Sequence, residues 1–90
     1  MIRYTVHISS SAVKALNKIP KKDQLRIAGV FVLLAENPLP PKATKLSGRE
    51  GYRVRSGDYR VIYTFEQNRL EVLVIKIGHR RDIYRAKGLK

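Results

Sequence analysis

The chain of 90 residues contains no cysteine and only two histidines. Without cysteine the protein has no disulfide framework and no thiolate metal site, which fits a reducing compartment. Two histidines without clustered carboxylates also leave no set of residues typical of a metal centre. We therefore expect a cytoplasmic protein that works without a metal or any other cofactor.

Long apolar segments are absent as well. The longest runs, near Gly29–Ala35 and Val72–Ile75, are far too short to span a membrane. The first residues, Met1 to Ile8, lack the charged and apolar blocks of a signal peptide. The sequence therefore predicts no membrane partner, and its length predicts one domain over positions 1–90 with a single core.

Acidic residues are scarce, because 7 of them stand against 19 basic residues and give a net charge of +12. A surplus this large on a small domain favours a polyanionic partner such as nucleic acid or the ribosome. An acidic protein partner is equally consistent with the charge, and the two kinds of partner are compatible with each other.

Apolar periodicity predicts a first strand and two helices. Residues 2–8 alternate between apolar and polar, as a half-buried strand does. A first helix is expected from a serine cap at positions 9–11 to Pro20, and a second from Lys21 to Asn37. The apolar stripe of the second helix is predicted to hold Leu25, Ala28, Val32 and Ala35, with Ile27, Phe31 and Leu34 beside it.

The second half of the chain is predicted to form a loop and three strands. Positions 37–51 carry three prolines and two glycines and are expected to form an ordered loop. Strands follow at 52–55, 59–65 and 69–77, and the last is apolar enough to be the central strand. The order β-α-α-β-β-β predicts an α+β domain, in which two helices pack on one face of a twisted, mainly antiparallel sheet.

Basic side chains recur with period two on these strands. Arg53 and Arg55 share one face of their strand, and Arg60 takes the corresponding phase of the next strand. If the hairpin pairs in simple register, the three arginines converge on the sheet face away from the helices. The last strand is expected to deliver three further groups to the edge of the same region: His79, Arg80 and Tyr84.

Such groups suffice to cleave RNA. Guanidiniums bind phosphate through paired hydrogen bonds and stay charged, a phenol stacks on a base or donates a proton, and a histidine exchanges a proton near neutral pH. Attack of a 2′-hydroxyl on the adjacent phosphodiester needs a base, cations for the phosphorane and an acid for the leaving oxygen, but no metal. Further residues expected to contact RNA or the ribosome are Lys42, Lys45, Arg49, Arg81 and Arg85.

Each of these residues also has a simpler explanation when taken alone. Alternating arginines usually form a solvated polar face, and Arg60 has Asp58 and Glu66 nearby as possible ion-pair partners. A single histidine such as His79 is a weak indication of chemistry. The functional interpretation depends on one grouping, which comprises Arg53, Arg55, Arg60, Arg80 and Tyr84.

Two motifs, Tyr59-Arg60-Val61-Ile62-Tyr63 and the ending Gly78-His79-Arg80-Arg81-Asp82-Ile83-Tyr84-Arg85, resemble those of the RelE toxins of the RelE/ParE superfamily. The element order and the Asn37-Pro38-Leu39-Pro40 loop leading to Leu46-Ser47-Gly48 are similar to theirs too. The resemblance covers nearly the whole chain. It implies a cytoplasmic toxin of a bacterial or archaeal toxin–antitoxin pair that enters the ribosomal A site and cuts mRNA there.

The same resemblance implies partners for the protein. A cognate antitoxin would wrap and silence the toxin, and we expect it to be an acidic, largely helical segment that covers the basic face. Operator DNA would be contacted only through the complex of toxin and antitoxin.

The resemblance also implies roles for individual residues. Two basic residues fall on Arg53 and Arg55, where well-known members carry lysines, and the phosphate-binding arginine falls on Arg60. The C-terminal arginine and tyrosine fall on Arg80 and Tyr84. Because an arginine does not release its proton, Arg53 and Arg55 are expected to act as electrostatic stabilisers. Proton transfer is then expected from another group, for which His79 is a candidate; Tyr84 is expected to stack on a base, orient the 2′-hydroxyl or donate a proton.

Two alternatives stay open at this point. A ParE-like gyrase inhibitor would be a binding module on the same fold without nuclease activity, although its members generally lack the clustered basic residues and the C-terminal tyrosine. A nucleic-acid-binding domain without catalysis explains the charge but leaves His79 and Tyr84 without a role.

Overall fold

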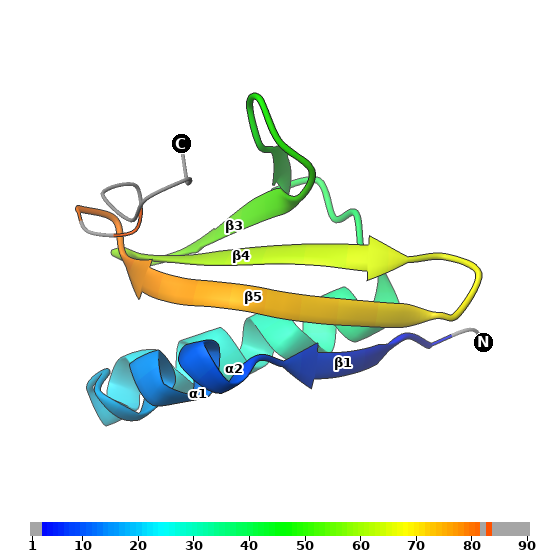
Figure 1. The fold of residues 1–90 in the computed structure, drawn as a ribbon. Coiled ribbons are helices and arrows are strands. Elements are labelled where there is room, and N and C mark those ends of the chain that lie inside the picture. The colour runs from blue at the N-terminus through cyan, green and yellow to red at the C-terminus, as the bar shows by residue number, and fades with distance from the viewer. Residues whose placement is uncertain (1–2, 82, 84–90) are drawn as a thin grey trace.

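The computed structural model describes residues 3–81 and 83 of the chain. Figure 1 shows the two helices on one face of a twisted sheet, which confirms the predicted α+β class. A short strand inside the segment 37–51 was not predicted, since only two residues of that segment pair with the sheet. The elements in chain order are β1 Thr5–Ile8, α1 Ser10–Asn17, α2 Lys21–Glu36, β2 Thr44–Lys45, β3 Tyr52–Ser56, β4 Tyr59–Glu66 and β5 Glu71–His79.

The strands lie in the order β1-β5-β4-β3-β2. Only β1 and β5 pair in parallel and the other neighbours are antiparallel, so the prediction of a mainly antiparallel sheet is confirmed. β5 is an interior strand, but β4 rather than β5 is the middle one. The outer face of β5 is turned away from α1 and α2, and Leu73 on it is 44% exposed.

Polar side chains fasten the helical hairpin to the sheet. Ser9 is the N-cap of α1, where its Oγ accepts a hydrogen bond from the Ala12 N–H at 3.2 Å. The same Oγ donates to the carbonyl of Ile75 on β5 at 2.8 Å. At the other end of α1, Gln24 Nε2 donates to the carbonyls of Leu16 and Ile19 at 3.0 and 2.9 Å.

The main core lies between the helices and the inner face of the sheet. From α2 it takes Ile27, Val30 and Leu34, whereas Leu25 and Val32 are 67% and 55% exposed. The part of the predicted apolar face formed by Ile27, Phe31 and Leu34 therefore meets the sheet, whereas the expectation for Leu25 and Val32 was wrong. Both sets of residues have helical spacing, so periodicity alone did not decide which of them meets the sheet.

An extra residue in β5 changes the pairing of β4 with β5. Ile62 lies opposite Lys76 but Tyr63 lies opposite Val74, so Ile75 is left over as a β-bulge. Beyond the bulge the alternation of side chains is reversed: Ile77 joins the main core, and Lys76 shares the other face with Ile62. Ser9 holds the bulge in place, because its N–H donates to the Val74 carbonyl at 2.9 Å in addition to the bond from its hydroxyl.

Tyr63 links the middle strand to the proline-rich segment. Its side chain is fully buried and its hydroxyl donates to the Pro38 carbonyl at 2.6 Å. Burial, with a smaller contribution from Tyr52, raises the pKa of Tyr63 far above its ordinary value, so the phenol stays protonated and the bond intact.

We predict that Tyr63→Phe lowers the free energy of unfolding by about 1–3 kcal/mol, because the buried Pro38 carbonyl loses its donor. Urea unfolding measures the change. The matched control is Tyr52→Phe, since the Tyr52 hydroxyl is only half-buried and makes no hydrogen bond with a described residue. Equal stability of Tyr63→Phe and the wild type would contradict the anchoring role.

Candidate functional site

The arginines predicted to converge do so on the face of the sheet turned away from α1 and α2, which we call the open face. Arg55 on β3 pairs with Arg60 on β4, and Arg60 pairs with Gly78 on β5. One step along, Arg53 pairs with Ile62. Gly57 sets this register, because with φ of 60° it takes the first place of the two-residue turn between β3 and β4. The predicted simple register of the hairpin is thereby confirmed.

Arg55 and Arg60 form the centre of the basic region. Residues directly opposite in an antiparallel pair have Cβ atoms about 4.5–5.5 Å apart, and like charges at that distance destabilise the sheet. Arg55 is exposed, while Arg60 is half-buried and donates through Nη1 to the carbonyl of Tyr59 at 3.2 Å. Two arginines paired across neighbouring strands suit a phosphate, which accepts paired hydrogen bonds from a guanidinium.

A small apolar cluster supports this region from the open face. Leu46, Ile62 and Ile83 pack together and are at most 6% exposed. A Cβ added to Gly78 would lie 3.5 Å from the Cβ of Ile83, so Ile83 packs directly over that glycine. The Ile83 N–H donates to the His79 carbonyl at 2.9 Å, which folds the chain after β5 back onto the open face.

Arg80 is tied to the turn between β3 and β4. Its N–H donates to the Asp58 carbonyl at 2.7 Å, and its Nε lies 3.8 Å from Asp58 Oδ1. Asp58, which the sequence offered as a partner for Arg60, therefore pairs with Arg80 instead. The Arg80 side chain is still 53% exposed, so its guanidinium remains accessible at the end of the sheet where Arg55 and Arg60 lie.

His79 lies on the other face. It pairs with Tyr59 on the helix side, where the two rings meet edge to face with centroids 5.6 Å apart. Its Nδ1 accepts a hydrogen bond from the Arg81 N–H at 3.1 Å. The expectation that β5 delivers His79 to the arginine-lined region was wrong, because the bulge reverses the alternation of side chains. Its role in proton transfer stays a prediction without support from this geometry.

Lys76 belongs to the open face and was missed from the sequence. If side chains alternated regularly from the buried Val72 and Val74, Lys76 would lie on the helix side. Because of the bulge at Ile75, it lies on the same face as Arg60 instead. The only indication in the sequence is a lysine inside an otherwise apolar run, which is a costly place for a charge unless it faces outward.

Of the other residues predicted to contact RNA, Lys45 pairs with Tyr52, which packs against the main core on the helix side. Lys45 on β2 holds its Nζ 5.8 Å from the centre of the Tyr52 ring. Lys42, Arg49 and Arg81 are exposed. Tyr84 and Arg85 lie outside the described residues.

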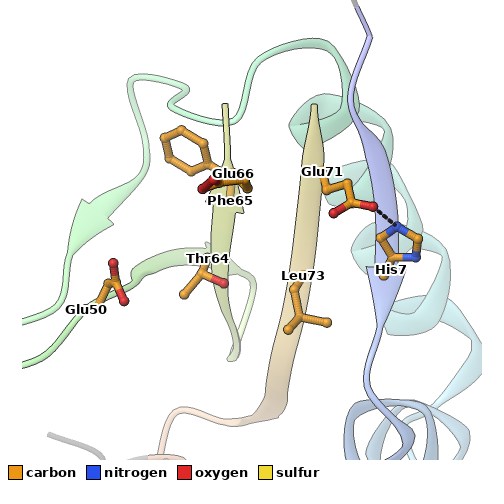
Figure 2. Close-up of a pocket in the computed structure, with 7 residues that line it drawn as sticks. All are labelled: His7, Glu50, Thr64, Phe65, Glu66, Glu71 and Leu73. Carbon is orange, nitrogen blue, oxygen red and sulfur yellow. Dashed lines mark ion pairs between the residues drawn. The ribbon is translucent and has the colours of Figure 1, made fainter. Parts of the chain in front are cut away.

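The opposite end of the open face is acidic. A pocket of about 350 Å³ lies at the end of β4 and the start of β5, where Figure 2 shows Thr64 and Leu73 with Glu50, Glu66 and Glu71 around them. Glu71 lies 3.4 Å from His7 Nε2, and Glu50 and Glu66 also line the pocket. Three of the seven acidic residues thus gather at this end, away from Arg55 and Arg60. The open face therefore favours a phosphate chain at one end and repels it at the other.

Across residues 3–81 and 83, no three histidine, aspartate or glutamate side chains lie close enough together to hold a metal ion. Neither helix within that range is long and apolar enough to cross a membrane.

Comparison with known proteins decides the family. The family model of ParE toxins of type II toxin–antitoxin systems matches residues 6–84. The chain belongs to the RelE/ParE superfamily of type II toxins. The predicted resemblance is therefore confirmed.

Individual relatives agree with this assignment. The chain is 30% identical over 86 residues to toxin RelG of Mycobacterium tuberculosis (strain ATCC 25618 / H37Rv), covering 91% of this chain and 97% of the relative. A chain of the archaeal RelE–RelB complex from Pyrococcus horikoshii OT3 matches with a TM-score of 0.75 and 31% identity, covering 89% of this chain and 97% of that one. The toxin–antitoxin complex RelBE2 from Mycobacterium tuberculosis matches with a TM-score of 0.77 and 25% identity, over 88% of this chain and 100% of that one.

We predict that His79→Phe speeds hydrogen exchange at the Arg81 amide, since the acceptor is lost while a ring beside Tyr59 is kept. A hydrogen bond of about 0.5–1.5 kcal/mol corresponds to a change of roughly 2- to 13-fold. His79→Asn is the matched control, because an asparagine side chain accepts from the N–H two residues on. The assignment fails if the phenylalanine variant exchanges as slowly as the wild type, measured by NMR.

Proposed function

We propose that the protein inhibits translation as a ribosome-dependent endoribonuclease that cuts mRNA in the A site. The observation that carries the proposal is the pair Arg55 and Arg60, held opposite each other on the open face and flanked by Arg53 and Arg80. Close like charges of this kind raise the free energy of the folded protein, and a bound phosphate offsets that cost. Membership of the RelE/ParE superfamily supports the same function.

The reaction proposed is attack of a 2′-oxygen on the adjacent phosphorus. The bond from phosphorus to the 5′-oxygen breaks, which leaves a 2′,3′-cyclic phosphate and a 5′-hydroxyl. Charge on the equatorial oxygens increases on the way to the phosphorane, and Arg60 and Arg55 are placed to stabilise it. Arg53 and Arg80 add positive charge on either side. Tyr84, whose position is not described, is proposed to stack on a base of the codon.

Dependence on the ribosome follows from the shape of the site. Among the described residues, the basic region lies beside the apolar cluster of Ile62 and Ile83, and the pocket of the open face lies at the other end. Positioning can contribute several kcal/mol to lowering a barrier, and on this account the A site holds the mRNA in place of the protein. The partners proposed are therefore ribosomal RNA and mRNA in the cytoplasm.

A cognate antitoxin is also proposed. The relative from Pyrococcus horikoshii OT3 was solved as a RelE–RelB complex, and this chain offers a basic open face that an acidic, largely helical segment would cover. α2 offers apolar anchors as well, because Leu25 and Val32 are exposed one turn on either side of Gly29, where an added Cβ would meet nothing within 4 Å. Operator DNA would be bound only through the complex.

Gyrase inhibition is the second candidate, because the matching family model is described as ParE toxin. Pulse labelling after induction separates the two functions. An early fall in protein synthesis supports the nuclease, and an early fall in DNA synthesis supports action on gyrase.

We predict that Arg60→Ala slows single-turnover cleavage on programmed ribosomes by about 10²–10³-fold, the usual effect of removing one preorganised donor. The variant should stay folded, because Arg60 is only half-buried and fills no space in the core. Arg69→Ala is the control and should match the wild type, since Arg69 is exposed in the turn between β4 and β5. Wild-type activity in a folded Arg60→Ala protein, or equal cutting of naked mRNA, would refute the proposal.

We further predict that Leu25→Ser together with Val32→Ser weakens the antitoxin complex without reducing cleavage. Burying such side chains contributes about 1.5–3 kcal/mol each, so affinity measured by calorimetry should fall by at least tenfold. Leu70→Ser, also at an exposed leucine, serves as the control. Unchanged affinity of the double variant would show that the antitoxin docks elsewhere.

A further inference from the structure

We propose that Lys76 is a catalytic residue of this nuclease and that its ammonium donates the proton to the leaving 5′-oxygen. The inference rests on the proposed function. It goes beyond it by assigning the acid of the reaction to a residue on β5.

The register of the sheet places Lys76 beside the phosphate-binding arginines. Lys76 pairs with Ile62, and Arg60 pairs with Gly78, so Lys76 and Arg60 are diagonal neighbours on adjacent strands. Diagonal neighbours are about 7–8 Å apart and within reach of long side chains. Ile62 also pairs with Arg53 on its other side, so one cross-strand row carries a cation at each end of a buried isoleucine. Leu46 and Ile83 cover Ile62 itself, so the phosphate is proposed to lie beside this apolar cluster, within reach of Arg60 and Lys76 together.

The placement of Lys76 is built into the fold. It depends on the bulge at Ile75, and that bulge is held by hydrogen bonds from the backbone and the hydroxyl of Ser9. Lys76 is half-buried, and the side chain opposite it is the apolar Ile62. Packing of its methylene groups against apolar surface, with the ammonium held out, is the usual arrangement for a lysine in this setting.

Among the described groups at this end of the open face, Lys76 is the one whose chemistry suits proton donation. Arginines keep their protons, so Arg53, Arg55 and Arg60 serve as fixed charges. His79 faces the helix side, and the carboxylates of the open face line the pocket at its far end. An alkylammonium is a far stronger acid than the alcohol formed when the 5′-oxygen leaves, so transfer from Lys76 is favourable as that bond breaks.

The step balances without a further reactant. The 2′-oxygen forms a bond to phosphorus while its proton passes to water. The electron pair of the bond between phosphorus and the 5′-oxygen goes to that oxygen, which takes a proton from Lys76 Nζ. The neutral amine then recovers a proton from water after the product leaves.

The test is single-turnover cleavage on programmed ribosomes with two matched mRNAs, one of which carries sulfur in place of the bridging 5′-oxygen. A thiolate leaves without protonation, so the sulfur substrate needs no acid. Lys76→Met should lose about 10²-fold or more on the oxygen substrate and recover to within a few-fold of the wild type on the sulfur substrate. Lys76→Arg keeps the positive charge but does not release a proton, so it should also lose activity on the oxygen substrate and recover on the sulfur substrate. Arg60→Ala should be slow on both substrates.

Three results would overturn the assignment. In the first, Lys76→Met cuts the oxygen substrate at the wild-type rate. In the second, Lys76→Met is equally slow on both substrates, as expected if Lys76 acts only through its charge. In the third result, Tyr84→Phe rather than Lys76→Met is slow on the oxygen substrate and recovers on the sulfur substrate. That result would make Tyr84 the acid. Urea unfolding and ribosome binding of each variant show that it is folded and engaged. A wild type that cuts neither mRNA would instead overturn the proposed nuclease function on which the assignment rests.

Discussion

The pairing register of β4 with its two neighbours is the constraint on which the rest of the site depends. It sets Arg55 opposite Arg60, and it does so through a two-residue turn that begins with Gly57 in the left-handed region. Two unit charges 4 Å apart repel by about 1 kcal/mol in bulk water and by more near a protein surface. A domain of 90 residues is only marginally stable, so the cost of this arrangement supports the proposal that the open face binds phosphate.

One additional residue in β5 decides which face of the sheet the following side chains of β5 occupy. The bulge at Ile75 turns Lys76 outward and His79 toward the helices, and Ser9 at the start of α1 holds it. The helix cap, the bulge and the open face are therefore one structural unit. At the other end of the same face, Glu50, Glu66 and Glu71 oppose the binding of a phosphate chain. The charge along this face therefore limits where the proposed RNA substrate could bind.

Local patterns in the sequence were sufficient to predict most of the helices and strands. Proline, serine and glycine mark the ends of the helices and turns, and period two placed Arg53, Arg55 and Arg60 on one face. Three features depend on tertiary pairing that periodicity does not reveal. β2 is only two residues long, the sheet meets one of two equivalent stripes on α2, and the bulge exchanges the faces of Lys76 and His79.

The central claim is that this face directs a 2′-hydroxyl against the adjacent phosphate of mRNA held in the ribosome. The most direct measurement is the chemical identity of the ends produced, by mass spectrometry of mRNA fragments from programmed ribosomes incubated with the protein. The account predicts a 2′,3′-cyclic phosphate, or the 3′-phosphate that forms from it, on one fragment and a 5′-hydroxyl on the other. Fragments with a 3′-hydroxyl and a 5′-phosphate, or mRNA left intact, would contradict it.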